Sequence, residues 1–248
     1  MPSVRKIEVT VTTPDGNCPA TLHTPDGTGA WPGVVMYVDA GGVRDTMHEM
    51  AQQLADSGYA VLLPDVYYRH GEWKPFDMRT AFSDQEERTR LMSMVGSVTP
   101  DMIASDAGAF FDFLEQRPEV SGSRFGIFGY CMGGRTSVIV AGRQPDRVAA
   151  AGSFHGGGLV TDDPNSPHLL ADRMKATVYV AGAENDGGFT AEHAETLDKA
   201  LTAAGVEHMV EFYPAAHGFA VPDNPPYDKA AADRHWAALE RLFGNSLS

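Results

Sequence analysis

Short, continuous apolar segments that alternate with amphipathic ones constrain the fold of this 248-residue sequence more than any other feature. The segment 33–38 (GVVMYV) has no polar face, which is typical of a strand buried on both sides. Strands that alternate with helices imply a mostly parallel central sheet with helices on both faces. We therefore expect an α/β fold with about eight strands. The expected strands cover 4–12, 20–24, 33–38, 60–63, 124–128, 148–153, 177–182 and 208–213, and the expected helices cover 46–57, 100–117, 133–143, 190–204 and 228–243.

Residues 67–99 interrupt this alternation. The segment is polar and irregular, and its aromatic residues Trp73, Phe76 and Phe82 are scattered without a period. Long excursions of this kind in a compact domain often act as lids or binding loops. We expect a single domain over 1–248, with 67–99 as a lid or substrate-binding excursion.

The charge and the cysteine content exclude several classes of partner. Lys and Arg number 19 against 33 Asp and Glu, which gives a formal net charge of −14 at pH 7. Nucleic acid and anionic membranes require a basic face, so neither is expected as a partner. The sequence has no apolar stretch of the roughly 18 residues that span a membrane, no signal-peptide core, and too few cysteines for a disulfide framework. These features predict a cytoplasmic enzyme for a small molecule, as a monomer or small homo-oligomer.

A glycine-rich turn follows one of the expected strands, at the edge where parallel sheets bind ligands. Gly129-Tyr130-Cys131-Met132-Gly133-Gly134 joins strand 124–128 to helix 133–143. This is the G-x-S-x-G nucleophile turn with Cys in place of Ser. It would put the sulfur at a helix N-terminus, where the helix dipole favours the thiolate. Cys131 is therefore the candidate nucleophile; the alternative is a buried structural cysteine. Cys18 has no such context.

A cysteine nucleophile needs a base, and the base needs an orienting group. Asp186 and His217 lie in the loops after the last two expected strands, in the order nucleophile, acid, histidine that accompanies this turn. Glu184 is the alternative acid, and His217 could instead be a surface histidine. His155 also follows a strand but precedes the acid, so we expect it in the wall of the pocket.

These residues resemble the dienelactone hydrolase family of α/β-hydrolases. The similarity extends over nearly the whole chain and includes His217-Gly218-Phe219-Ala220 and Pro64-Asp65-Val66-Tyr67. It implies an α/β-hydrolase fold and a carboxylic ester hydrolase that cleaves a lactone or activated ester through a thioester on Cys131. It also implies no metal and no cofactor. The backbone N–H groups of Ala40 and Met132 would form the oxyanion hole.

The resemblance assigns further roles. Asp39 stands where the family has a carboxylate, usually Glu, that takes part in activating the thiol. Arg90 corresponds to one of two arginines that hold the carboxylate of the substrate, and Val221 occupies the position of the other, so half of that clamp is missing. Tyr130 and His155 complete the expected substrate-binding residues.

Two other interpretations stay open. The departures at Asp39 and Val221 would suit a binding protein that keeps the fold without turnover. The triplet His193-Ala194-Glu195 would suit a class I glutamine-amidotransferase-like enzyme, although it falls inside the expected helix 190–204.

Overall fold

The computed structural model describes residues 4–247 and is built on one eight-stranded sheet with the strand order β1-β2-β4-β3-β5-β6-β7-β8. The strands are β1 (Val4–Thr13), β2 (Gly16–Pro25), β3 (Trp31–Tyr37), β4 (Ala60–Pro64), β5 (Val120–Tyr130), β6 (Val148–Phe154), β7 (Thr177–Asn185) and β8 (His208–Ala216). β2 pairs antiparallel with β1 and with β4, and all other neighbours pair in parallel. The expected α/β architecture is confirmed.

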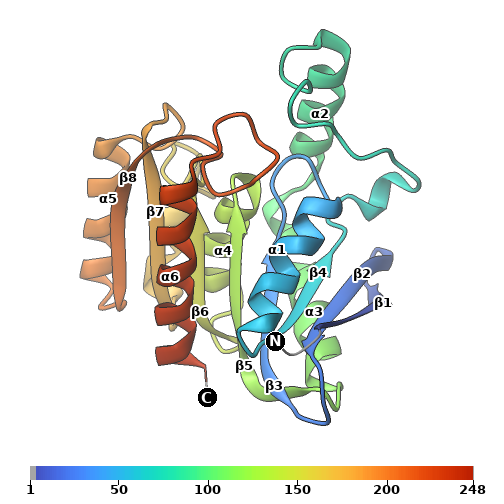
Figure 1. Cartoon of the computed structure of the whole chain (residues 1–248). Coiled ribbons are helices and arrows are strands. Elements are labelled where there is room, and N and C mark those ends of the chain that lie inside the picture. The colour runs from blue at the N-terminus through green and yellow to red at the C-terminus, as the bar shows by residue number, and fades with distance from the viewer. Residues whose placement is uncertain (1–3, 248) are drawn as a thin grey trace.

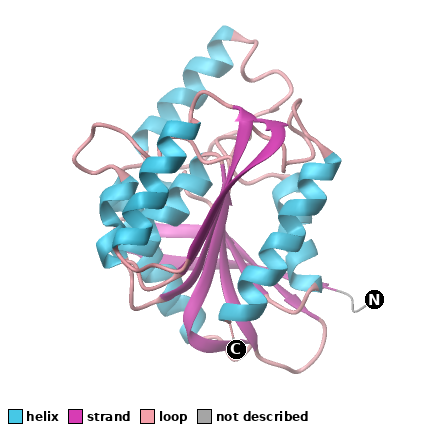
Figure 2. Cartoon of the chain, turned by 90° about the vertical axis from the view of Figure 1, so that its left-hand side faces the viewer, coloured by secondary structure: helices cyan, strands magenta, loops and turns pink. Residues whose placement is uncertain are grey.

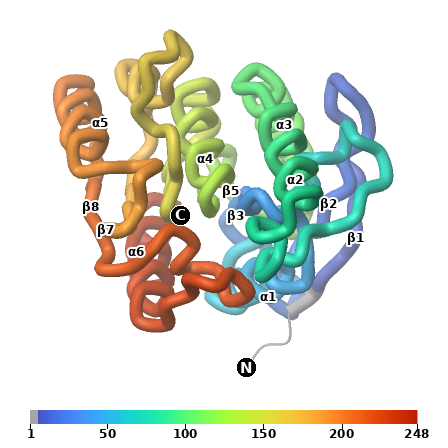
Figure 3. The backbone as a smooth tube through the Cα atoms, turned by 90° about the horizontal axis from the view of Figure 1, so that it is seen from above, coloured from blue at the N-terminus to red at the C-terminus, as the bar shows by residue number. Residues whose placement is uncertain are grey.

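Two helical layers cover the sheet. The helices are α1 (Asp45–Asp56), α2 (Gln85–Ser97), α3 (Pro100–Glu115), α4 (Met132–Arg143), α5 (Ala191–Ala203) and α6 (Lys229–Ser246), with short 3₁₀ segments at η1 (Tyr68–His70) and η2 (Pro167–Arg173). Figure 3 shows α1 and α6 on one face and α3, α4 and α5 on the other, each layer with its own apolar cluster. Figure 2 shows the strong twist of the sheet between them. No helix within 4–247 is long and apolar enough to cross a membrane.

The start of α3 illustrates how the sequence sets an element. The side-chain oxygen of Thr99 accepts the Met102 N–H at 3.3 Å, and Pro100 occupies the first helical turn. The helix then buries Phe110 and Phe111 against the sheet. Each such side chain contributes about 1.5–3 kcal/mol of hydrophobic stabilisation when fully buried.

The excursion 67–99 is more ordered than we expected, because α2 forms within it. Asp84 caps this helix by accepting the N–H groups of Glu86 and Glu87, both at 2.9 Å. Only Leu91 and Met94 of α2 are buried. Figure 1 shows α2 standing beyond the end of the sheet, on the side where the parallel strands finish. The excursion therefore lies over the edge at which the candidate site residues were predicted.

Candidate active site

Cys131 occupies the turn between β5 and α4 in a strained backbone conformation. Its φ is 54° and its ψ is −114°, and a non-glycine residue in such a region costs about 1–3 kcal/mol. A β carbon at Gly133 would lie 2.4 Å from the carbonyl oxygens of Tyr37 and Val38, so the turn can pack against β3 only with glycine there. The sulfur lies at the N-terminus of α4, where the helix dipole favours its ionised form.

His217 and Asp186 form a hydrogen-bonded pair at the ends of the neighbouring strands β8 and β7. Nδ1 of His217 and Oδ2 of Asp186 are 2.6 Å apart, and Oδ1 of Asp186 accepts the Gly188 N–H at 2.8 Å. Burial alone would lower the pKa of His217, but hydrogen bonding to Asp186 and Cys131 and their negative charges raise it to about 10. Burial would raise the pKa of Asp186, yet these two hydrogen bonds lower it. The pair favours a protonated imidazole beside the sulfur.

Hydrogen bonds fix two successive peptides of the loop after β3. The peptide between Asp39 and Ala40 is held by its carbonyl oxygen, which accepts the Gly42 N–H at 3.1 Å. Because the N–H of a trans peptide points opposite to its carbonyl, the Ala40 N–H points away from Gly42. Tyr67 donates its hydroxyl to the Ala40 carbonyl at 3.0 Å and so fixes the next peptide. The orientation of this loop is thus fixed, and the role of the Ala40 N–H in an oxyanion hole stays a prediction.

Arg44 ties this loop to the loop that carries His217. It forms a two-bond pair with Asp39 (Nη1–Oδ1 2.7 Å, Nη2–Oδ2 2.9 Å) and another with Asp223 (Nε–Oδ2 2.7 Å, Nη2–Oδ1 2.8 Å). Arg44 and Asp223 lie 179 positions apart in the sequence. The side chains of Arg44 and Asp39 are only 8% and 1% exposed. The network holds the two loops together from within.

A cavity of about 470 Å³ opens at these loops. The side chains that line it come from the turn, the two loops and the excursion: Asp39, Ala40, Met78, Arg79, Phe82, Ser83, Cys131, His217, Gly218, Asn224, Pro225 and Pro226. The candidate nucleophile and base share this cavity, and Asp186 supports the base from behind.

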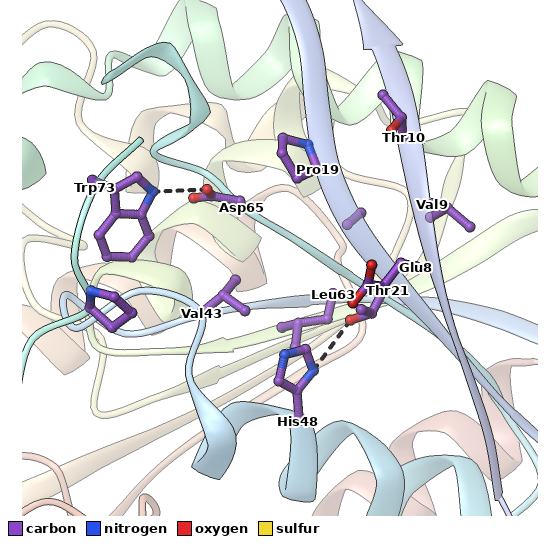
Figure 4. A pocket seen from close by; sticks show the side chains of 12 residues that line it. Glu8, Val9, Thr10, Pro19, Thr21, Val43, His48, Leu63, Asp65 and Trp73 are labelled. Atoms are coloured by element: carbon purple, nitrogen blue, oxygen red, sulfur yellow. Dashed lines mark hydrogen bonds between the residues drawn. The ribbon is translucent and has the colours of Figure 1, made fainter. Parts of the chain in front are cut away.

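A second cavity, of about 490 Å³, lies between α1 and the β1–β2 hairpin (Figure 4). Trp73 donates its indole N–H to Asp65 at 2.8 Å, and His48 lies 3.4 Å from the hydroxyl of Thr21. The cavity is slightly larger than the one at Cys131, but neither cysteine lines it. The cavity at Cys131 is therefore the candidate active site.

Four residues expected to contact substrate do not line the cavity. Tyr130 and Val221 are fully buried in the core, where the Tyr130 hydroxyl lies 2.8 Å from Nε2 of His235. His155 is also fully buried, and its ring packs behind His217 with the centroids 5.1 Å apart. Arg90 pairs with Glu87 of its own helix and stacks on Phe76. Tyr130, His155 and Val221 are buried in the core, and the side chain of Arg90 contacts Glu87 and Phe76 instead of the cavity.

The other predicted residues do meet. Ala40, Asp39, Cys131 and His217 line one cavity, and Met132 follows the nucleophile at the start of α4. Both carboxylate oxygens of Asp39 already accept hydrogen bonds, from Arg44 and from the Gly41 N–H at 2.9 Å. The role of Asp39 in activating the thiol stays a prediction.

Met78, Arg79 and Phe82 come from the predicted binding excursion 67–99, although they were not singled out as site residues, whereas Arg44 and Tyr67 had no predicted role. Tyr67 belongs to the segment Pro64-Asp65-Val66-Tyr67, which carried the family resemblance, so it offered a signal. Arg44 offered none, because its partners become apparent only in three dimensions.

Cys18 is a contrasting thiol. It is fully buried, and burial raises its pKa far above the ordinary value. A thiol in such surroundings is inert. Among residues 4–247, no group of three His, Cys, Asp or Glu side chains is arranged to hold a metal ion.

Comparison with known proteins gives consistent matches. The model of the dienelactone hydrolase family matches residues 18–247. A Methylorubrum extorquens protein named "Putative carboxymethylenebutenolidase" is 29% identical over 242 residues, which is 95% of this chain and 79% of that protein. A Synechocystis protein of the same name is 26% identical and covers 91% of each chain. The crystal structure of the dienelactone hydrolase-like promiscuous phosphotriesterase P91, from metagenomic libraries, has a TM-score of 0.81 at 27% identity, covering 99% of this chain and 100% of P91.

Proposed function

The chain belongs to the dienelactone hydrolase family, and on that premise we propose that it hydrolyses a lactone or another activated carboxylic ester through a thioester on Cys131. The observation that carries the proposal is the position of Cys131. It lies in a strained turn at the start of α4 and shares a cavity with His217, which is paired with Asp186. A thiol that meets a histidine oriented by a carboxylate is the arrangement that nucleophilic catalysis requires.

The first step is acylation. The Cys131 thiolate attacks the carbonyl carbon of the ester, a carbon–sulfur bond forms, and the carbonyl oxygen becomes an oxyanion. The N–H groups of Ala40 and Met132 would stabilise this oxyanion, and each preorganised donor is worth about 3–4 kcal/mol. The oxyanion then collapses, the carbon–oxygen bond to the leaving group breaks, and the protonated His217 gives its proton to the departing alkoxide or enolate.

The second step is deacylation. Neutral His217 takes a proton from water as the water attacks the thioester, and collapse of the second oxyanion releases the acid and the Cys131 thiolate. Thiolate is itself a good leaving group, so the first tetrahedral intermediate also collapses backwards. Substrates with poor leaving groups, such as amides, suffer most from this return. Activated esters and lactones suffer least, which is why we propose them.

The test is hydrolysis of 4-nitrophenyl acetate by the wild-type protein, by Cys131→Ala and by Cys18→Ala as a matched control. We expect Cys131→Ala to lose turnover and Cys18→Ala to keep it, because Cys18 is buried away from the cavity. Intact-protein mass spectrometry of the quenched wild type should reveal one added acetyl group, located at residue 131. Full turnover by Cys131→Ala would refute the proposal.

The two alternatives are tested in parallel. His193 lies in α5, where its ring accepts the Thr190 N–H at 3.4 Å and caps the helix. This placement gives it a local structural role and weakens the amidotransferase alternative, for which glutaminase activity without esterase activity would be the evidence. A binding protein without turnover should instead hydrolyse none of these esters, and Cys131 should alkylate no faster than an ordinary free thiol.

A further inference from the structure

The cavity at Cys131 contains a buried carboxylate. Asp39 lines the cavity and is only 1% exposed. A carboxylate brought into the same space would lose its water, and a buried charge is costly unless a hydrogen-bonded cation pairs with it.

Arg44 cancels much of the Asp39 charge, but it has no N–H group left to pair with a second carboxylate. Nε and both terminal nitrogens of Arg44 donate all five of their N–H bonds, four to the carboxylates of Asp39 and Asp223 and one to the Gly42 carbonyl at 3.0 Å. A guanidinium has five N–H donors in total. Arg44 therefore has none left for a substrate, and it does not line the cavity.

The other two arginines of this region are also poorly placed to bind an anion inside the cavity. Arg90 donates to both oxygens of Glu87 and to the Lys74 carbonyl. Arg79 does line the cavity, but it is exposed, and it also lines a neighbouring surface hollow that contains Asp223. An exposed charge pair contributes about 0.2–1 kcal/mol.

His217 also lines the cavity, but its ring is hydrogen-bonded to Asp186 and Cys131. Apart from Ser83 and Asn224, the remaining walls are apolar. Met78 and Phe82 of the excursion face Pro225 and Pro226 of the loop after β8, and Ala40 lies beside the nucleophile. Met78 and Ala40 are buried, whereas Phe82 is 54% exposed and forms part of the mouth. These walls favour hydrocarbon over a charged group.

We propose that the site selects esters and lactones whose acyl part is uncharged and apolar, and that it discriminates against acyl groups that carry a carboxylate because the buried cations beside the cavity are already paired. The proposal rests on the proposed function, because it concerns the acyl group that is transferred to Cys131.

The test compares three 4-nitrophenyl esters that differ only at the far end of a six-carbon acyl chain. Hexanoate ends in a methyl group, the adipate monoester ends in a carboxylate, and the methyl adipate ester ends in a neutral group at least as large as that carboxylate. Each rate is divided by that of uncatalysed hydrolysis in the same buffer. We expect kcat/KM for hexanoate to exceed that for the carboxylate ester by about tenfold or more, which corresponds to at least about 1.4 kcal/mol. The methyl adipate ester should lie within about threefold of hexanoate, a difference of less than 1 kcal/mol.

A variant tests the one exposed arginine in the cavity wall. In Arg79→Gln, we expect the ratio between hexanoate and the carboxylate ester to change less than about threefold, because an exposed cation contributes little. The matched control is Thr80→Ala, because the side chain of Thr80 is exposed and does not line the cavity.

Three results would overturn the proposal. The carboxylate ester could be hydrolysed as well as hexanoate. Both adipate esters could be slow to the same extent, in which case size and not charge governs selection. The carboxylate ester could lose its rate selectively in Arg79→Gln, which would assign that arginine to anion capture. Failure of the proposed function is distinguishable from all three, because then none of the esters would depend on Cys131.

Discussion

Replacement of Arg44 by Met tests whether the network between the two loops holds the site together. The change keeps an unbranched side chain and removes all five hydrogen bonds of the guanidinium. It leaves the Asp39 carboxylate buried without its cation, since Asp39 is 1% exposed. Removal of one partner of a buried ion pair destabilises a protein by about 3–5 kcal/mol. A typical unfolding free energy is about 5–15 kcal/mol, so we expect a variant that folds but is much less stable.

The stability lost in Arg44→Met should also depend on pH. Burial alone would raise the pKa of Asp223, but hydrogen bonds and attraction to Arg44 lower it below 3.8. A depressed pKa contributes stability that is present above 3.8 and is lost as the pH falls through the lower, folded-state value. The difference in unfolding free energy between wild type and Arg44→Met should therefore be full at neutral pH and shrink below about pH 4.

The measurement is urea unfolding at several pH values, with Arg90→Met as the matched control. Arg90 pairs with Glu87 at side-chain exposures of 31% and 41%, and its stacking on Phe76 can be replaced by the Met side chain. Arg90→Met should lower the unfolding free energy by about 1 kcal/mol or less. Arg44→Lys, which keeps the charge but loses the planar fork, should fall between the two. If Arg44→Met is no less stable than Arg90→Met, the network does not hold the loops as we argue.

Three further predictions concern the turn, the base and the oxyanion loop. Asp186→Asn should remove the interactions that raise the pKa of His217 to about 10, so the alkaline limb of the kcat/KM profile should move to lower pH. In that variant kcat should fall by about 10²-fold or more; an unmoved alkaline limb would contradict the assignment. Gly133→Ala should destabilise the protein by about 2 kcal/mol or more, because its β carbon would lie 2.4 Å from two carbonyl oxygens, whereas Gly96→Ala in α2 meets no atom within 4 Å. The Gly96 variant should be neutral or up to about 1 kcal/mol more stable in thermal unfolding, and equal effects at both positions would refute the steric argument. Tyr67→Phe should lower kcat more than it raises KM, because it releases the carbonyl that the hydroxyl holds at 3.0 Å; a change confined to KM would exclude this positioning role.

The regular elements of the fold could be predicted because the pattern of apolar residues in each segment shows which of its faces are buried. The run 33–38 is apolar at every position after the glycine, and β3 duly lies between two helical layers. α2 could not be predicted in the same way, because Leu91 and Met94 are its only buried residues and its polar faces leave no clear apolar period. Its buried residues pack against other residues of the excursion, and the sequence of the helix alone does not predict these contacts.

The same distinction holds for the site: the positions of its residues along the chain were predictable, but their side-chain directions were not. Cys131, Asp186 and His217 follow strands, and the parallel topology brings the ends of those strands to one edge. The direction of a side chain is not encoded in this way. Tyr130 directly precedes Cys131, and Val221 lies four positions after His217, yet both side chains are buried in the core. Arg44 joins two loops through partners that are distant in sequence, and such a contact is determined only by the complete fold.

Backbone strain is confined to the same edge. Within residues 4–247, Cys131 and His155 are the two non-glycine residues with positive φ, at 54° and 40°. Each is anchored to the next strand: the Cys131 N–H donates to the Phe154 carbonyl at 3.0 Å, and the His155 N–H donates to the Ala181 carbonyl at 2.8 Å. Such conformations cost about 1–3 kcal/mol each and persist only where the surrounding structure fixes them.

The strained backbone at His155 does not position its side chain for a hydrogen bond. Within the described part of the chain neither ring nitrogen has a partner, and burial lowers the pKa of His155 well below its ordinary value, so the ring is neutral. Its ring meets that of His217 edge to face, at an interplanar angle of 62°. Because the His155 ring is neutral, it packs against the His217 ring without electrostatic repulsion when His217 is protonated. The two strained strand ends therefore have complementary effects: one positions the sulfur of Cys131, and the other packs against the ring of His217, the base in the proposed mechanism.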